Sequence, residues 1–269
     1  MDAQQANTNI KKAIKTYVDN IWLELRERWN QWPKDLTQKE LHEVIGGIMS
    51  RQVAIMTNYS SNSSLWNNEM APIILRSMVD NYINMAWIAM NPLERSQKFI
   101  LHGLGQAKLQ IEHRKKQLEQ DGINSATDPM VEATESWINT QRYTFLTEVN
   151  LGSWSGLNTR TMAEEAGCID LYNYVYQPFS TAAHNMWNHI SRYNLIQSEN
   201  PFHKFMLTPT LGVFDAELEY FELGAKYVDK LFHLFDTTFD HEPKIKSSYE
   251  IVADQIDKTE IQLRNSKEA

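Results

Sequence analysis

The sequence predicts an all-α fold, a multi-helix bundle with a long bent helix and a polar C-terminal helix or tail. Apolar residues recur at steps of three and four along most of the 269 residues, which is the period of amphipathic helices. With only 10 glycines and 8 prolines, the chain has few of the turn residues that a many-stranded sandwich or barrel needs. Neither strand-like alternation nor an internal repeat stands out. An apolar content of 42% and a charged content of 22% are ordinary for a globular protein, so we expect a real core.

Four helices are predicted in the first half of the chain, over residues 10–29, 37–58, 69–90 and 93–120. Trp32-Pro33 ends the first, and Thr37 with Glu40 has the form of a capping box at the start of the second. The third is apolar nearly all round, which predicts a central position. The fourth becomes strongly charged toward its end, so we expect that end to project beyond the core.

Further helices are predicted in the second half, over residues 130–149, 159–166, 169–196, 213–239 and 248–265. Pro178 falls inside the stretch 169–196 and is expected to bend it. We expect three parts: an N-terminal helix packed on the core (1–35), a main helical domain (36–242) and a polar helix or flexible tail (243–269).

Charge and cysteine content exclude several function classes. The net charge of −8 and the isoelectric point near 5.5 argue against a broad DNA-binding surface or attachment to an anionic membrane. The most apolar stretch, residues 71–90, carries Arg76, Asp80, Asn81 and Asn84, which favours a buried helix over a membrane span. The single cysteine, Cys168, cannot form an internal disulfide, and the polar N-terminus does not resemble a secretory signal. We therefore expect a cytoplasmic protein.

Arg76 and Asp80 are the only charges inside the apolar third helix. Their four-residue spacing places them on one helix face as a candidate ion pair. Enclosing two charges is costly, which favours a functional explanation, although a pair that fixes helix register is an equal alternative.

A second polar row consists of Tyr172, Tyr176, Ser180 and His184. These residues recur every four positions, so consecutive members touch along a helix. His184 can change charge near neutral pH and is the best single candidate for proton transfer. A satisfied core histidine is the alternative. Ser180 lacks the Gly-x-Ser-x-Gly context of an activated nucleophile and is assigned to ligand binding together with Tyr176 and Asp80.

Trp154-Ser155-Gly156, followed by Arg160, precedes this row. Gly156 permits a tight turn, and a connector anchored by Trp154 is the simpler interpretation. Arg160 joins the candidate ligand site only if the fold carries it toward His184.

Together these motifs resemble a family. Arg76 with an acid four residues later, Trp154-Ser155-Gly156 with Arg160, and the succession from Tyr172 to His184 resemble the pattern of the bacterial all-helical family of unknown function DUF5677. The resemblance spans roughly residues 40 to 240 and implies an intracellular helical protein without implying an activity. At position 178 the family pattern leads us to expect a helix-favouring residue, and this chain has proline. The orientation of Tyr176 relative to His184 is therefore left open.

Arg95 and His102 lie seven residues apart and fall on nearly the same helix face. This Arg-x6-His spacing resembles the signature of HEPN domains, many of which are metal-independent ribonucleases of bacterial defence and toxin systems. The resemblance implies that His102 moves a proton while Arg95 stabilises phosphate charge, commonly across a dimer. Ser96 stands where the family has Asn or Asp, and a solvent-facing pair is the alternative.

Metal and cofactor signals are weak. Glu222, Asp229, His233, Asp236 and Asp240 form a stripe on the last long helix, but Lys226 in the same stripe repels a cation, so a solvated acidic face is favoured. No phosphate-binding glycine-rich loop is present, so no cofactor is expected.

Two functions remain open. The first is an effector or a module that binds a ligand or partner in a polar pocket between helices, with phage defence as one setting. The second is a HEPN-like ribonuclease that uses Arg76 or Arg95 with His184 or His102 on RNA. A homo-oligomer or a partner protein is expected in either case, because Phe232, Phe235 and Phe239 give the last long helix an aromatic side that suits a core or a dimer interface.

Overall fold

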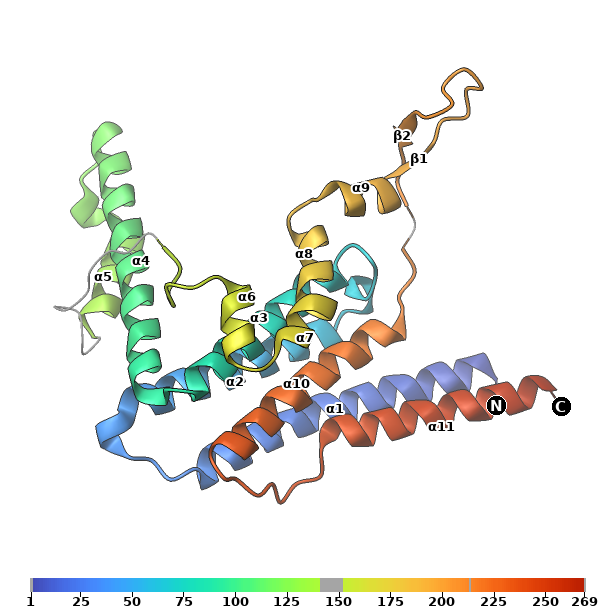
Figure 1. Cartoon of the computed structure of the whole chain (residues 1–269), viewed down its shortest axis with the longest axis horizontal. Helices are drawn as coiled ribbons and strands as arrows, with labels where there is room; N and C mark the ends of the chain where they lie inside the picture. Colours follow the sequence, from blue (N-terminus) through green and yellow to red (C-terminus); the bar gives the residue numbers. More distant parts are fainter. Residues whose placement is uncertain (1, 141–151, 213, 269) are drawn as a thin grey trace.

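The computed structural model describes residues 2–140, 152–212 and 214–268, and these are almost entirely helical (Figure 1). The longer helices are α1 (Ala3–Gln31), α2 (Lys39–Ser60), α3 (Ala71–Ala89), α4 (Pro92–Gln120), α5 (Pro129–Asn139), α10 (Leu218–Thr238) and α11 (Ser248–Glu268). Short elements connect them: η1 (Leu36–Gln38), η2 (Ser63–Leu65), η3 (Ser125–Thr127), α6 (Thr159–Glu165), α7 (Ile169–Leu171), η5 (Tyr172–Tyr176), α8 (Gln177–Ala183) and α9 (Trp187–Tyr193). The predicted all-α multi-helix fold is confirmed. One small addition had no signal in the sequence pattern, an antiparallel ladder of β1 (Leu195–Gln197) and β2 (Leu207–Pro209), with Ile196 opposite Thr208.

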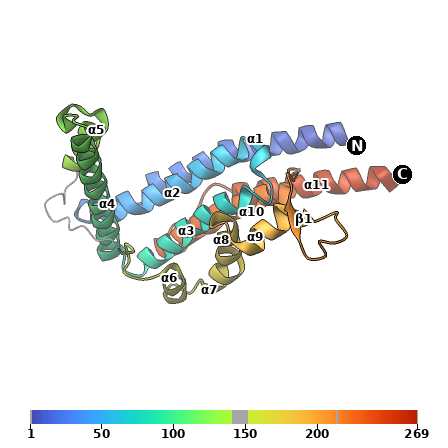
Figure 2. The same cartoon turned by 90° about the horizontal axis from the view of Figure 1, so that it is seen from above.

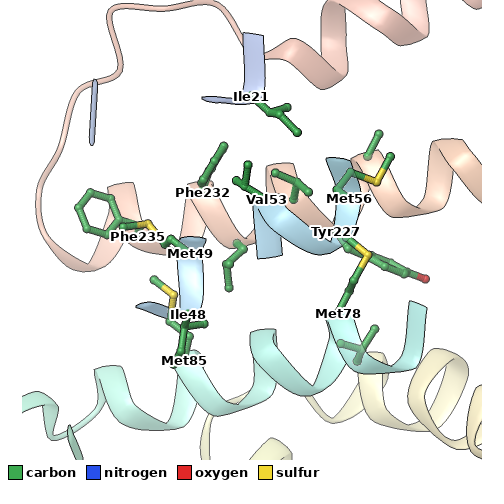
Figure 3. Packing of buried hydrophobic residues seen from close by; sticks show 14 of the residues in the cluster. Ile21, Ile48, Met49, Val53, Met56, Met78, Met85, Tyr227, Phe232 and Phe235 are labelled. Carbon is green, nitrogen blue, oxygen red and sulfur yellow. The ribbon is translucent and has the colours of Figure 1, made fainter. Parts of the chain in front are cut away.

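The core lies where α2, α3 and α10 meet, with α1 covering it from the other side (Figures 2 and 3). Ile21, Val53, Met78 and Phe235 come from four different helices and are each at most 1% exposed. Ten residues of α3 are buried, in agreement with the central position predicted from its nearly continuous apolar sequence. Gly224 lets α10 approach α2 closely, because a Cβ at this position would lie 2.8 Å from the sulfur of Met56. The core therefore depends on contacts between helices that are distant in the sequence.

Helices α1 and α11 run side by side along the length of the molecule (Figures 1 and 2). Val252 and Ile256 of α11 are 1% exposed, so the expected C-terminal polar helix covers core rather than hanging free. The boundary expected at residue 243, between the main helical domain and the C-terminal part, stays a prediction.

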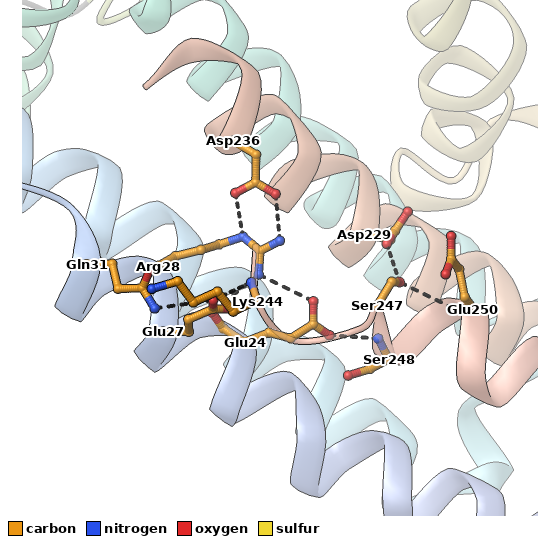
Figure 4. A network of polar contacts seen from close by, with 10 residues as sticks. All are labelled: Glu24, Glu27, Arg28, Gln31, Asp229, Asp236, Lys244, Ser247, Ser248 and Glu250. Carbon is orange, nitrogen blue, oxygen red and sulfur yellow. Dashed lines mark hydrogen bonds and ion pairs between the residues drawn. The ribbon is translucent and has the colours of Figure 1, made fainter. Parts of the chain in front are cut away.

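A buried polar network fastens the connection between α10 and α11 to α1 (Figure 4). Arg28 donates two hydrogen bonds to the Asp236 carboxylate, at 2.9 and 2.6 Å, and its side chain is 4% exposed. Its Nη1 lies 3.3 Å from the Glu24 carboxylate, which in turn accepts the backbone N–H of Ser248 at 2.8 Å. Asp229 accepts the hydroxyl of Ser247 at 2.6 Å. Asp229 and Asp236 thus bind their own chain, and the expectation of a solvated acidic face was wrong at these two positions.

The distal part of α4 leaves the core and pairs with α5 in a projecting arm (Figure 1). A separate small cluster of Ile111, Leu118, Val131 and Ile138 holds this arm together. The projection of α4 agrees with the expectation from its charged end. The helix predicted to reach residue 149 ends as α5 at Asn139, and residues 141–151 lie outside the described part of the chain.

The stretch 169–196 is divided into short pieces instead of forming one bent helix. Proline has no N–H and its ring crowds the preceding turn, and the π turn η5 ends directly before Gln177-Pro178. The chain then leaves the helix at Asn185, which has a φ of +52°, and resumes in α9. The first break in the helical backbone of this stretch therefore lies after Ala183, while Pro178 follows the π turn inside the first turn of α8, and a bend at Pro178 stays a prediction.

Candidate functional site

Arg76 is the centre of a polar cluster at the seam between α3 and α8. Its Nε donates to the Ser180 hydroxyl at 2.9 Å, and its Nη2 donates to the Tyr176 hydroxyl at 2.6 Å. The guanidinium carbon also lies 4.7 Å from the centre of the Tyr176 ring, within the range of a cation–π contact. The π turn and α8 thus supply two residues, four apart, that hold one guanidinium in place.

The guanidinium of Arg76 retains hydrogen-bonding capacity toward a ligand. It has five N–H groups, and two of them donate to Ser180 and Tyr176. The separation of Nη1 from the Asp80 carboxylate is 3.9 Å, which is too long for a hydrogen bond. Three N–H groups therefore have no hydrogen bond within the described residues, while the side chain is 22% exposed. An orientated and incompletely satisfied guanidinium suits the recognition of a carboxylate or phosphate.

Asp80 lies beside this cation and is partly shielded from water. Burial raises the pKa of its carboxyl, while Arg76, the Tyr176 hydroxyl and His184 act in the opposite direction. The Tyr176 hydroxyl thus affects both charged groups, because it accepts a hydrogen bond from Arg76 and acts to lower the pKa of Asp80. Asp80 is a candidate proton carrier because its environment disfavours the ionised form.

His184 ends α8 and is exposed. It is the last of the groups that act to lower the pKa of Asp80, after Arg76 and Tyr176. The structure thus brings four sequence-predicted residues together, Arg76, Asp80, Tyr176 and Ser180, and His184 follows Ser180 by four residues at the end of α8.

The hydroxyl of Ser180 is already committed. It donates to the backbone oxygen of Tyr176 at 2.7 Å and accepts from Arg76, so its proton is not directed at a base. Tyr172 stacks on Tyr176 with ring centres 5.1 Å apart. These contacts orient the Arg76 cluster, so Asp80 and His184 are the residues of this set that stay candidates for proton transfer.

Trp154 lies next to the cluster without entering its described contacts. Its Nε1 donates to Asn84, one helical turn beyond Asp80 on α3, at 3.3 Å. Its ring packs edge-on against Trp87 and Phe99. Arg160 is exposed on α6, and its described partner is Glu164 at 2.9 Å. Trp154 anchors the segment before α6 to α3, as the simpler interpretation holds.

Arg95 and His102 occupy a different part of the molecule from the Arg76 contacts. Arg95 donates to the backbone oxygen of Trp87 at 2.5 Å, lies 3.6 Å from the centre of that indole ring and reaches Glu165 at 3.7 Å. These contacts fasten the start of α4 to α3 and α6. His102 is half-buried on α4. Arg95 thus contacts Trp87 and Glu165 and is about as exposed as Arg76, at 19% against 22%.

No group of three or more His, Cys, Asp or Glu side chains that could hold a metal ion occurs among the described residues. The same residues contain no helix long and apolar enough to cross a bilayer.

A polar contact at the base of the β1–β2 hairpin lies outside the sites predicted from the sequence. The carboxylate of Glu69 accepts from Asn194 at 3.0 Å and lies 3.4 Å from Nε2 of His189, which is 8% exposed. A histidine and an asparagine five residues apart gave no indication that both would face one glutamate from the segment before α3.

More than half of the chain matches a known family profile. Residues 42–202 match the family of unknown function DUF5677. The chain belongs to this family. The DUF5677 segment contains all the predicted site residues, whereas α10 and α11 lie beyond it, so the match ends earlier than the resemblance to residue 240 implied. No curated protein and no solved structure matches the chain.

Proposed function

We propose that this chain is a helical binding module or effector that takes up an anionic group of a small ligand or partner at Arg76. The observation that carries the proposal is the guanidinium held by Tyr176 and Ser180 with three N–H groups still without a hydrogen bond among the described residues. Asp80 and His184 beside it supply groups that can bind the polar remainder of the ligand. The site lies in the DUF5677 segment.

Titration calorimetry with inorganic phosphate and adenosine 5′-monophosphate tests the proposal. Arg76→Gln should weaken binding roughly 10- to 100-fold, the equivalent of one lost charge-assisted contact. Arg160→Gln is the matched control, because that arginine is exposed and its described partner, Glu164, lies on its own helix. Equal affinities in both variants, with a lower melting temperature for Arg76→Gln alone, would return Arg76 to a structural role.

A second candidate is a metal-independent ribonuclease, favoured by the acid–base pair Asp80 and His184 next to a guanidinium. His184 would move the proton of a ribose 2′-hydroxyl while Arg76 stabilises charge on the phosphate. Cleavage of a single-stranded RNA should fall at least about 100-fold in His184→Ala. In His102→Ala it should persist, because the Arg95 of that pair is bound by Trp87 and Glu165. Loss in His102→Ala alone would favour the HEPN-like pair instead.

The proposal includes a cytoplasmic role in bacterial defence and an assembly with a second copy or partner protein. Support for assembly comes from the hairpin between β1 and β2, where Phe202 and Phe205 are 94% and 89% exposed. Light scattering on Phe202→Ser/Phe205→Ser tests assembly, and a phage challenge of cells expressing Arg76→Gln tests the defence role. An unchanged molecular mass would contradict the assembly, and an unchanged plaque count would contradict the defence role.

A further inference from the structure

A pocket of about 590 Å³ lies between the N-terminal half of α1, the end of α2 and the start of α10. Its size is within the range of small-molecule sites. It involves none of the Arg76 cluster, and both α1 and α10 lie outside the DUF5677 segment. The pocket is therefore a separate feature of the molecule.

Apolar side chains from three parts of the chain line this pocket. Ile10, Ile14 and Val18 come from α1, Trp66 directly follows η2, and Leu218 comes from the first turn of α10. Trp66 is 6% exposed and its indole N–H donates to the backbone oxygen of Tyr59, so its ring presents only apolar surface. An alkyl chain is the chemistry that such walls accommodate.

Positive charge borders the same pocket. Lys11 and Lys15 both line it, and neither forms an ion pair within the described residues. They lie one turn apart on α1, so their charges repel each other. This arrangement occurs in a chain whose net charge is −8. Two uncompensated lysines at the edge of an apolar pocket are complementary to a single anionic head group.

No acidic side chain lines the pocket among the described residues. Glu217 lies between two lining residues in sequence and accepts a hydrogen bond from Asn68 at 3.2 Å, but it is not part of the lining. The hydroxyls of Ser60 and Ser61 donate to their own helix, to the backbone oxygens of Met56 and Thr57. The lysines are therefore the charged groups available to a ligand here.

We infer that the pocket between α1, α2 and α10 binds an amphipathic anion, an unbranched alkyl chain with one carboxylate or phosphate head. The chain lies against Ile14, Val18 and Trp66, and the head group lies between Lys11 and Lys15. A free carboxylate and a phosphate head share this chemistry.

Titration calorimetry of the full chain with decanoate and with decyl phosphate tests the inference and compares the two head groups. Binding of either at one molecule per chain is the expected result. Octanoate should bind roughly 10- to 15-fold more weakly than decanoate, because each buried methylene contributes about fourfold in affinity. Decanol and decyltrimethylammonium, which lack the negative charge, should bind at least about fivefold more weakly.

Charge variants identify the site. Lys11→Gln/Lys15→Gln should weaken decanoate binding roughly 5- to 30-fold and leave the melting temperature unchanged or higher, because a repulsion is removed. Lys12→Gln is the matched control, since Lys12 lies between them in sequence but does not line the pocket. Arg76→Gln should bind decanoate normally, which separates this inference from the proposed function.

Three calorimetric results, and one from light scattering, would overturn the inference. The calorimetric results are no saturable binding of either anion, equal affinity for decanol, or equal weakening in the double variant and Lys12→Gln. Light scattering tests whether a second copy of the chain occupies the pocket. If the anion binds only while a dimer dissociates to monomers, the pocket belongs to the second copy, and the inference is overturned.

Discussion

Removal of the Asp236 carboxylate is expected to destabilise the protein far more than removal of a surface carboxylate. Asp236 accepts two hydrogen bonds from Arg28, and the two side chains are 10% and 4% exposed. In Asp236→Ala the guanidinium would stay buried against Phe232, with Glu24 at 3.3 Å as its remaining charged partner. Breaking a buried pair from one side costs about 3–5 kcal/mol, and the remaining Glu24 favours the lower end, about 3 kcal/mol.

Urea unfolding followed by circular dichroism measures this free energy. Asp254→Ala is the control, because its partner Lys258 is 67% exposed, and it should change stability by less than about 0.5 kcal/mol. The triple variant Glu24→Gln/Arg28→Met/Asp236→Leu should recover most of the loss, because it removes all three charges of the network and leaves none unpaired. A loss below about 1 kcal/mol in Asp236→Ala would refute the argument that this guanidinium depends on Asp236.

Three further predictions concern single residues. Burial raises the pKa of Asp80 above its value in the unfolded chain, so the free energy of unfolding decreases as pH rises from the unfolded-state pKa to the folded-state pKa. Asp80→Asn should therefore be more stable than the wild type at pH 7. In thermal melts this gain should vanish near pH 3, where the carboxyl is protonated in both states. Gly156 has a φ of +76°, so Gly156→Ala should lower the free energy of unfolding by about 1 kcal/mol. Gly47 lies on an open helix face, so Gly47→Ala should raise it by about 0.5–1 kcal/mol. Urea unfolding measures both changes, and changes of the same sign would contradict the backbone argument. Burial raises the pKa of the Cys168 thiol, so its alkylation by iodoacetamide at pH 8 should be slower than that of free cysteine, and an equal rate would show that the thiol is accessible and unshifted.

Periodicity was sufficient to predict the helices that pack along their whole length. The third helix has apolar residues on nearly every side, and its sequence alone indicated the central place that α3 occupies. The same reasoning failed over residues 169–196, because a periodic sequence does not show that a proline will follow a π turn or that Asn185 will adopt a positive φ. Local backbone geometry there depends on packing against α3.

The polar contacts were harder to predict than the helices. Four-residue spacing predicted that Arg76 and Asp80 share a face and that Tyr176 and Ser180 share another, but not that the two faces meet. Arg28 and Asp236 are 208 residues apart, so no local pattern could pair them, and Asp236 was interpreted as part of a solvated stripe. Arg95 shows the converse, since a spacing typical of a catalytic motif belongs to a side chain fixed by Trp87 and Glu165.

Because of the π turn, the surroundings of Arg76 depend on the number of residues in the stretch Tyr172–Tyr176. A π turn corresponds to a helix that holds one more residue than its regular turns require. Deletion of one residue from Tyr172–Tyr176 would restore a regular helix and rotate the helix segment before the deletion by about 100° relative to the segment after it. Tyr176 and Ser180 would stay in register with each other, while α7 would face a new direction. Among related proteins, a difference of one residue in this stretch would therefore change the groups that pack beside the guanidinium even if every named side chain were retained.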